Sequence, residues 1–227
     1  MINAQATLEK KLGYQFNNSQ LLKSALSHRS VGSDNNERLE YLGDAILGYV
    51  IASILFEQHP QATEGELSRL RASLVKGETL ASLAKSLRLG DYLLLGPGEL
   101  KSGGGRRESI LAGALEAVIG AVYLDCGIEE ARDLILRLFR ERLTKASPKT
   151  IIKDPKTRLQ EHLQGLRKNL PVYETLSVSG AEHNQMFKVS CVVEGLEQPT
   201  LGAAASRRAA EQEAAKKALD ILLDDKN

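Results

Sequence analysis

Three carboxylates lie close together in one stretch of this chain, because Glu37, Glu40 and Asp44 stand at positions i, i+3 and i+7. On an α-helix this spacing places all three side chains along one face. Neighbouring acids repel one another, so the arrangement does not favour helix stability by itself. A hard divalent cation would turn the repulsion into binding, since such ions prefer carboxylate oxygens as ligands. The spacing is therefore compatible with a metal site or with a solvated acidic face.

The apolar residues of the same stretch predict the helix that must position these acids. They recur at helical spacing and form a stripe that we expect to face the core: Leu39, Leu42, Ile46, Tyr49 and Val50. The apolar pattern continues through residues 50–56. His59-Pro60 is expected to end the helix, because a residue that precedes proline is disfavoured in the helical conformation.

Further sequence blocks follow this stretch in a fixed order. Residues 37–44 read ERLEYLGD and residues 64–71 read EGELSRLR. Residues 95–99 read LGPGE, and they are followed by SGG at 102–104 and RESILA at 107–112. These blocks closely resemble those of the ribonuclease III family, and the last third of the chain resembles a double-stranded-RNA-binding domain. An ordered set of blocks is far more specific than any single motif.

The resemblance implies a double-stranded-RNA-specific endoribonuclease. Such an enzyme hydrolyses phosphodiesters with Mg²⁺, for which Mn²⁺ can substitute, and leaves 5′-phosphate and 3′-hydroxyl ends. The implied substrates are ribosomal RNA precursors and structured messenger RNAs. The resemblance also implies a homodimer, with Tyr41 standing where phenylalanine is common at the subunit contact.

The resemblance assigns roles to particular acids. The metal site is expected to be built from Glu40, Asp44 and Glu116, with Glu40 and Glu116 as direct ligands. Asp44 and Glu116 are the expected catalytic residues, and Asp44 would orient the water or the nucleophile. Glu37 and Glu64 match supporting acidic positions near the scissile phosphate, and Glu64 is the expected contact to a second metal or to the RNA backbone.

One position departs from the family pattern. The family carries an aspartate one helical turn before Glu116, whereas this chain has Gly113 there. Glycine offers no ligand and costs about 1 kcal/mol in a helix relative to alanine. Three explanations remain open: a loss of activity, rescue by water and high Mg²⁺, or a neighbouring acid that moves in. The alternative function is accordingly a double-stranded-RNA-binding protein with weak or no catalysis.

Composition sets wider limits. The chain has 227 residues, a formal net charge of +1, 42% hydrophobic residues and two cysteines without metal-ligand spacing. Residues 1–139 carry 15 basic and 17 acidic side chains, and residues 154–227 carry 10 basic and 11 acidic side chains. Neither part has a net positive charge, so RNA binding must rest on local basic patches. No secretion signal is visible, and no apolar run approaches the ~18 residues of a membrane span. We therefore expect a cytoplasmic protein without a membrane partner.

Two patterns divide the chain. An all-α endonuclease domain is expected over residues 1–147, a linker over 148–155, and a small α+β (α-β-β-β-α) double-stranded-RNA-binding domain over 156–224. In the first part we expect helices over 67–87 with a break at Gly77, over 109–124 capped by Ser109, and over 129–143. In the second part we expect a helix over 157–166, strands over 173–178, 187–193 and near 200–202, and a helix from Ser206 to Leu222.

RNA contacts are expected from three places in the second domain. Double-stranded RNA is read through 2′-hydroxyls and phosphates, which require polar side chains and cations near a helix N-terminus. The candidates by resemblance are Thr157, Gln160, Glu161, His183, Ser206, Arg207 and Arg208. The alternative for the two arginines is an ordinary solvated turn. Ala204 and Ala209 depart from the usual pattern, and the expected result is modest affinity with a shallower salt dependence.

Overall fold

The computed structural model describes residues 2–148, 154–181 and 185–224. The chain divides into two compact units, Met1–Ile151 and Ile152–Asn227. Each unit has its own hydrophobic core and is described by itself. The division falls inside the segment predicted as a linker.

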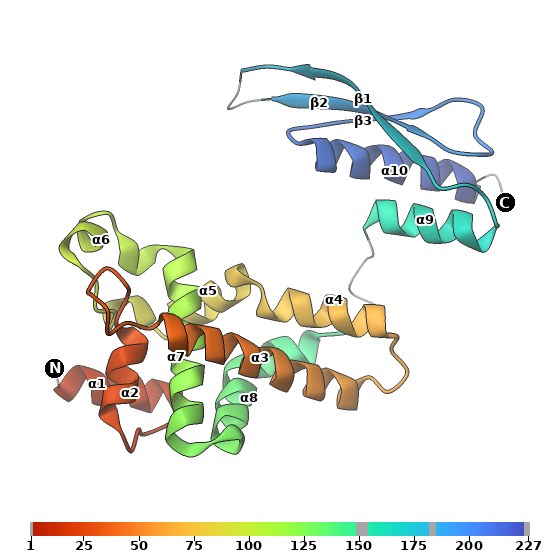
Figure 1. Cartoon of the computed structure of the whole chain (residues 1–227). Helices are drawn as coiled ribbons and strands as arrows, with labels where there is room; N and C mark the ends of the chain where they lie inside the picture. Colours follow the sequence, from red (N-terminus) through yellow and green to blue (C-terminus); the bar gives the residue numbers. More distant parts are fainter. Residues whose placement is uncertain (1, 149–153, 182–184, 225–227) are drawn as a thin grey trace. The chain divides into compact units, whose positions relative to one another are not determined.

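The first unit consists of helices arranged around a central one (Figure 1). In chain order they are α1 (Ile2–Leu12), α2 (Ser19–Leu26), α3 (Glu37–Gln58), α4 (Glu64–Val75), α5 (Gly77–Ser86), η1 (Leu89–Asp91), α6 (Pro97–Lys101), η2 (Gly104–Arg106), α7 (Glu108–Cys126) and α8 (Ile128–Lys145). Helices α2, α3, α5 and α8 all pack against α7. The predicted helical class of this part is confirmed.

Helix α7 is central because its sequence is apolar on every side. All residues from Ile110 to Val122 are buried except Glu116, which is only partly exposed. A helix that is hydrophobic all round belongs in a core. A carboxylate in the middle of such a helix is costly to bury unless it has a partner, so Glu116 marks a position with a role other than packing.

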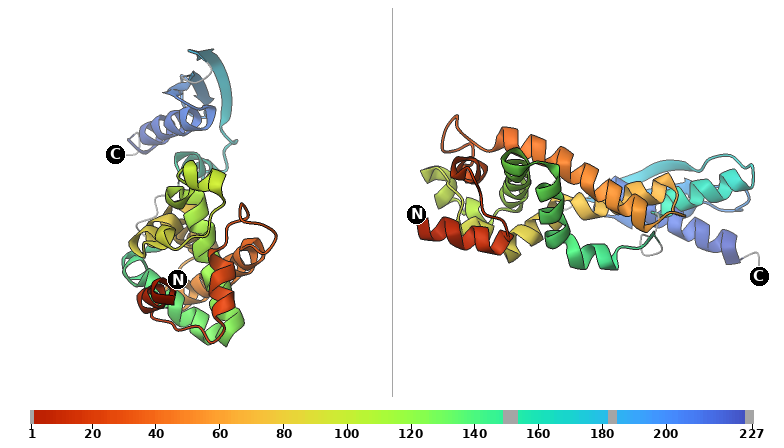
Figure 2. Two further views of the ribbon diagram at one scale, coloured as in Figure 1. Left: turned by 90° about the vertical axis from the view of Figure 1, so that its left-hand side faces the viewer. Right: turned by 90° about the horizontal axis from the view of Figure 1, so that it is seen from below.

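Helices α3 and α7 pack closely against each other, and Figure 2 shows their ribbons from two further sides. A Cβ atom at Gly43 of α3 would collide with the carbonyl oxygen of Glu116, and one at Gly120 of α7 would collide with the carbonyl oxygen of Leu39. Only glycine allows this approach at both positions. The crossing therefore brings the acids on the first two turns of α3 to the turn of α7 that carries Glu116.

The second unit has the predicted α-β-β-β-α order (Figure 1). Its elements are α9 (Pro155–Gly165), β1 (Val172–Ser179), β2 (Met186–Val192), β3 (Thr200–Ala204) and α10 (Arg207–Asp224). The strands are antiparallel in the order β1-β2-β3, and Val189 of β2 pairs with both Thr175 of β1 and Gly202 of β3. This confirms the predicted α+β class.

Helix α10 lies close against the sheet and against α9. A Cβ atom at Gly202 would collide with the carbonyl oxygen of Ala210, so glycine in β3 and alanine in α10 permit the close approach. The core of this unit is otherwise formed by small and aliphatic side chains: Leu159, Leu163, Cys191, Val193, Ala214, Ala215, Ala218, Leu219 and Leu222. The alanine-rich composition of α10 thus serves packing as well as helix propensity.

Two local predictions in the first unit are wrong. Ser109 is not an N-cap, because α7 begins at Glu108 and its cap residue Arg107 makes no side-chain capping bond. Tyr49 does not face the core, because 64% of its surface is exposed. Helical spacing alone placed Tyr49 in the apolar stripe, but α7 covers only the side of α3 that holds Leu39, Ile46 and Val50.

The expectation about apolar runs also needs correction. Helices α3 and α7 both have the length and the mean hydropathy of a membrane-crossing helix. In this fold they pack against each other, and α7 is buried from Ile110 to Val122 apart from Glu116. Their hydropathy is therefore accounted for by the core of the first unit.

Candidate active site

The acids of α3 and α7 open into one cavity of about 660 Å³. Its lining is His28, Arg29, Asn36, Glu37, Glu40, Tyr41, Asp44, Glu99, Arg107, Ser109, Ile110 and Glu116. The three acids predicted at helical spacing all lie on its wall. Glu116 joins them from the other helix, because the contact at Gly43 leaves no space between the two backbones.

The loop before α3 forms another wall and is fixed by nonlocal hydrogen bonds. The amide of His28 donates to the carbonyl of Leu94 at 3.0 Å, and the amide of Asn36 donates to the carbonyl of Ser27 at 2.8 Å. Asn36 is 4% exposed, although it is polar. These bonds hold the start of α3, and with it the acidic face, in a fixed position beside the loop that leads into α6.

Burial and mutual repulsion disfavour the ionised forms of two carboxyls in the cavity. Burial, followed by the charges of Asp44 and Glu40, raises the pKa of Glu116 to about 7. Burial also raises the pKa of Glu40, with Glu37 as the next cause, while Arg29 and His28 act in the opposite direction. Perturbed carboxyls gathered in one cavity are typical of functional sites rather than of surface acids.

The two arginines of the cavity are each paired with an acid on its wall. Arg107 Nη1 lies 2.9 Å from Glu99 Oε1, and Arg29 Nη1 lies 3.7 Å from Glu37 Oε1. Among the described residues, no ion pair joins Glu40, Asp44 or Glu116 to a basic group. Glu40, Asp44 and Glu116, here called the inner acids, therefore have no basic group at ion-pair distance in the described part of the chain.

The inner acids have the chemistry of a divalent metal site. Carboxylate oxygens on two elements are the ligands that Mg²⁺ and Mn²⁺ take, and a cation would relieve the repulsion that raises the pKa of Glu116. In the part of the chain that the structure describes, however, no group of three His, Cys, Asp or Glu side chains is already arranged to hold a metal ion. The acids share a wall of the cavity without converging on one point.

Two positions of the nuclease unit differ from the other acids: Glu64 lies apart from them, and Gly113 offers no ligand atom. Glu64, the first residue of α4, lines a different cavity together with Phe56 and Arg71, and it accepts a hydrogen bond from Ser68 at 2.6 Å. Gly113 is buried in α7 and faces Glu40. An ideal Cβ atom at this position would lie 2.7 Å from Cδ and Oε2 of Glu40 and 2.8 Å from its Oε1.

Sequence reasoning missed several residues of the cavity wall, namely His28, Arg29, Asn36 and Glu99. Glu99 was visible inside the block at 95–99, but nothing in its spacing connected it with residue 107. His28 and Arg29 carry no helical pattern, and they reach the cavity only because the bridge between Ser27 and Leu94 joins distant parts of the chain.

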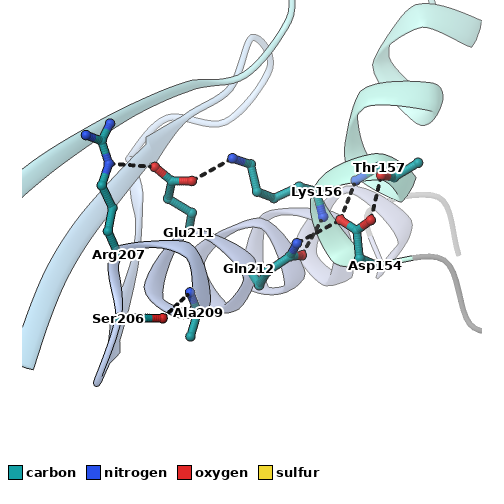
Figure 3. A network of polar contacts seen from close by, with 8 residues as sticks. All are labelled: Asp154, Lys156, Thr157, Ser206, Arg207, Ala209, Glu211 and Gln212. Atoms are coloured by element: carbon teal, nitrogen blue, oxygen red, sulfur yellow. Dashed lines mark hydrogen bonds and ion pairs between the residues drawn. The ribbon is translucent and has the colours of Figure 1, made fainter. Parts of the chain in front are cut away.

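A polar network joins α9 to α10 in the second unit (Figure 3). Lys156 Nζ and Arg207 Nε contact the two carboxylate oxygens of Glu211 at 2.6 Å and 3.0 Å. The carboxylate of Asp154 accepts bonds from the amide and the hydroxyl of Thr157 at 3.1 Å and 2.7 Å. It also accepts one from Nε2 of Gln212 at 2.8 Å. These bonds fix the N-terminus of α9 against the first turns of α10.

The network holds two of the residues predicted to bind RNA. Thr157 gives its hydroxyl proton to Asp154, so that group is already engaged. The guanidinium of Arg207 is oriented through Nε by Glu211, while its side chain remains 62% exposed. Ser206 accepts a bond from the amide of Ala209 at 3.2 Å, which confirms the predicted cap of α10.

The other residues predicted to bind RNA stand at the surface or outside the described part. Gln160, Glu161 and Arg208 are exposed on α9 and α10. His183 lies outside the described residues. The exposed residues at the start of α10 lie where the helix dipole favours phosphate.

Comparisons with known proteins agree with this geometry. The Ribonuclease-III-like family model matches residues 18–143, and the double-stranded RNA binding motif matches residues 155–222. The Ribonuclease 3 of Vibrio parahaemolyticus is 56% identical over 215 residues, which cover 95% of this chain and 96% of that protein. This chain belongs to the ribonuclease III family. The family member from Shewanella frigidimarina is 56% identical over 213 residues, covering 94% of each chain.

A solved ribonuclease III structure supports the assignment of the first unit. The nuclease domain of the Campylobacter jejuni enzyme matches with a TM-score of 0.59 and 46% identity, covering 60% of this chain and 94% of that one. This ribonuclease III family member is a double-stranded-RNA-specific endoribonuclease that depends on a divalent metal ion. Its second unit binds double-stranded RNA.

Proposed function

We propose that the metal ion is Mg²⁺, for which Mn²⁺ can substitute, and that cleavage leaves 5′-phosphate and 3′-hydroxyl ends. The observation that carries the proposal is the shared cavity of Glu40, Asp44 and Glu116, in which burial and the charges of Asp44 and Glu40 raise the pKa of Glu116 to about 7. Burying carboxyls that repel one another lowers the stability of the fold, so core packing does not explain these acids. The expected substrates are ribosomal RNA precursors and structured messenger RNAs, in the cytoplasm.

Each acid has a proposed task in this reaction. Glu40 and Glu116 would hold the ion, and Asp44 would accept a hydrogen bond from the attacking water and orient it toward the phosphate. The ion, when bound, supplies charge stabilisation for the phosphodiester and lowers the pKa of a water. Glu37 is proposed to support the site from the rim, and Glu64 to contact the RNA backbone or a second ion.

Gly113 is proposed to weaken catalysis. The family pattern places an aspartate there, and losing even an indirect partner of a metal typically costs about 10–100-fold in affinity or activity. We therefore expect cleavage that is slow at low-millimolar Mg²⁺ and that recovers as the concentration rises. A second candidate, a protein that binds duplex RNA and hardly cleaves it, is favoured by the same residue.

A cleavage assay with a short labelled RNA duplex tests these proposals. We expect the unmodified chain to require a higher Mg²⁺ concentration than Gly113→Asp for the same rate, and both to leave 5′-phosphate ends. Equal rates at low-millimolar Mg²⁺ would contradict the role given to Gly113. Binding without cleavage at every Mg²⁺ concentration would favour the second candidate.

We also propose a homodimer. Tyr41, Tyr49 and Phe56 on α3 are 81%, 64% and 71% exposed and lie on one side of the helix. A stripe of large exposed side chains is typical of an interaction surface. A solved nuclease domain of Campylobacter jejuni ribonuclease III is described as having a region involved in dimer formation. We expect Phe56→Asp to yield monomers in sedimentation analysis, and an unchanged dimer would contradict this surface.

RNA binding is proposed for Thr157, Gln160 and Glu161 on α9, for Ser206, Arg207 and Arg208 at the start of α10, and for His183, which lies outside the described residues. What supports this is the exposed N-terminus of α10, with Arg207 oriented by Glu211. The boundaries proposed for the domains remain residues 1–147 and 156–224, with 148–155 as linker.

A further inference from the structure

The sheet of the second unit has two edge strands that differ in regularity. The order β1-β2-β3 leaves β1 and β3 each with one side unpaired within the sheet. Such an edge presents N–H and C=O groups that can pair with a strand of another molecule. The register of β1 against β2 shifts between Thr175 and Ser177, and an irregularity of this kind hinders further pairing. Strand β3 pairs with β2 without interruption over residues 200–204, so it is the edge that another strand could extend.

Two backbone groups on the edge of β3 are bound by side chains of α10. The N–H of Ala203 donates to Oε2 of Glu213 at 3.0 Å. Nζ of Lys217 donates to the C=O of Leu201 at 2.7 Å. In an antiparallel ladder, every second residue directs both of its backbone groups to the neighbouring strand, and the residues between direct theirs away. Leu201 and Ala203 are therefore the residues whose backbone groups point away from β2.

The two α10 side chains reach this edge as a pair. Glu213 and Lys217 stand one helical turn apart, and Nζ of Lys217 lies 2.8 Å from Oε1 of Glu213. Their side chains are 41% and 52% exposed, so neither belongs to the core, and an ion pair this exposed contributes little to stability. The close approach of α10 to β3 at Gly202 brings both side chains beside the edge. What distinguishes the pair is its contact with the backbone of β3.

We propose that Glu213 and Lys217 close the edge of β3 to strand pairing and thereby keep the second unit from associating with a second copy of itself. An added antiparallel strand would bond both backbone groups of Leu201 and both of Ala203. One group of each residue is already bound, so a partner strand must first displace the carboxylate and the ammonium group. The partner that this arrangement excludes is β3 of a second copy, which offers the same edge for two-fold pairing.

Tethering makes such a closure necessary. In the homodimer proposed above, two copies of the second unit are attached to one pair of nuclease units through the proposed linkers at 148–155. Attachment through a short linker raises the effective concentration of the two copies to about the millimolar range. At that concentration even weak edge pairing would join the two copies. This step rests on the proposed homodimer, whereas the bonds at the edge of β3 do not.

Amide hydrogen exchange in the full chain, followed residue by residue by nuclear magnetic resonance, tests the proposal. Glu213→Ala combined with Lys217→Ala removes both edge bonds and keeps the helix propensity of α10 high. The N–H of Leu201 points to the open edge, so strand pairing would protect it. We expect its exchange in the double variant to be at least about tenfold slower than in the unmodified chain. A mere loss of structural contacts would make the exchange faster instead.

The matched control is Lys216→Ala combined with Asp220→Ala. It removes the same two charges at the same spacing from exposed positions of α10, so the exchange of Leu201 should not change. Lys217→Met keeps the aliphatic part of the side chain and frees only the C=O of Leu201. It should slow the exchange in the same direction, and it provides the test if the double variant unfolds.

The outcomes separate this inference from the proposed function. If Leu201 exchanges in the folded edge variants as fast as in the unmodified chain, or faster, the proposed closure is wrong. Equal slowing in the control variant would also overturn it, because the cause would then be the loss of surface charge. Neither result bears on the metal-dependent reaction, which the cleavage assay tests by itself.

Discussion

The cavity between α3 and α7 and the network between α9 and α10 hold their charges in opposite ways. In the network, the 12% exposed carboxylate of Glu211 is matched by Lys156 and Arg207, and Asp154 accepts three hydrogen bonds. In the cavity, the charges of Asp44 and Glu40 oppose the ionisation of Glu116.

The pKa values follow this difference. A hydrogen bond from Lys156 is the main cause that lowers the pKa of Glu211, whereas burial and like charge raise that of Glu116 to about 7. Satisfied acids stabilise the fold in which they sit. Carboxyls whose ionisation is opposed by burial and like charge lower the stability of the fold, and such groups are typical of functional sites.

The largest effect expected from this comparison is on catalysis. Asp44→Asn and Glu116→Gln remove the acids that we propose to orient the attacking water and to hold the ion, so each should reduce single-turnover cleavage more than about 100-fold. Neither should reduce the affinity for duplex RNA by more than a small factor in the absence of metal. Loss of RNA binding together with cleavage would show that these acids support the fold, as Glu211 does.

The next effect concerns the contact that brings the acids together. Gly43→Ala places a methyl group against the backbone carbonyl of Glu116, which cannot rotate away. Overpacking of this kind costs about 1–3 kcal/mol or more, so the urea midpoint of the first unit should fall and cleavage should fall with it. Gly48→Ala is the control within the same helix, because nothing lies within 4 Å of a Cβ atom there. Equal midpoints for the two variants would contradict the proposed crossing.

In the second unit, removing an acid should lower the free energy of unfolding of that unit rather than abolish catalysis. Glu211→Ala leaves Lys156 and Arg207 without their common partner, at a cost of about 1–3 kcal/mol. The α10 amide signals in nuclear magnetic resonance spectra of the full chain should therefore disappear at lower urea concentration, while those of α7 should not shift. A stability like that of the unmodified chain would mean that the pairs in Figure 3 contribute little.

The same network predicts a pH dependence. The hydrogen bond from Lys156 is the main cause that lowers the pKa of Glu211. Burial of Asp154 raises its pKa, but the hydrogen bonds from Thr157 and Gln212 outweigh burial, so the pKa of Asp154 is lowered as well. Groups with lowered pKa stabilise the fold above their unfolded values of about 4, and this contribution is lost as the pH falls through the folded values. The urea concentration at which half of the α10 amide signal is lost should thus fall between pH 5 and pH 3. The fall should be smaller in Glu211→Gln.

The smallest effect is on the salt dependence of RNA binding. Arg208→Ala removes one proposed phosphate contact, so the slope of log affinity against log salt should become shallower by about 1. Arg207→Ala should have the same effect on the slope, and in addition it should lower the α10 midpoint, because Arg207 also contacts Glu211. An unchanged slope in both variants would favour the solvated turn.

The elements were predictable wherever the local pattern was unambiguous. The helix from Glu37, the break at Gly77, the three strands and the Ser206 cap all depend on neighbours within one or two turns, and the structure contains each of them. Tyr49 and Ser109 were predicted wrongly for one reason. Which side of α3 is covered, and where α7 begins, depend on segments distant in the sequence.

The resemblance to the family singled out Glu116, and the sequence by itself placed the acids at i, i+3 and i+7 on one helix face. Local periodicity is sufficient for this, because it fixes which side chains share a face. Only the tertiary structure decided which groups these acids contact. Gly43 and Gly120 let two backbones touch, and so the carboxylate of Glu40 comes to lie above Gly113, a contact between residues 73 positions apart that no local pattern encodes.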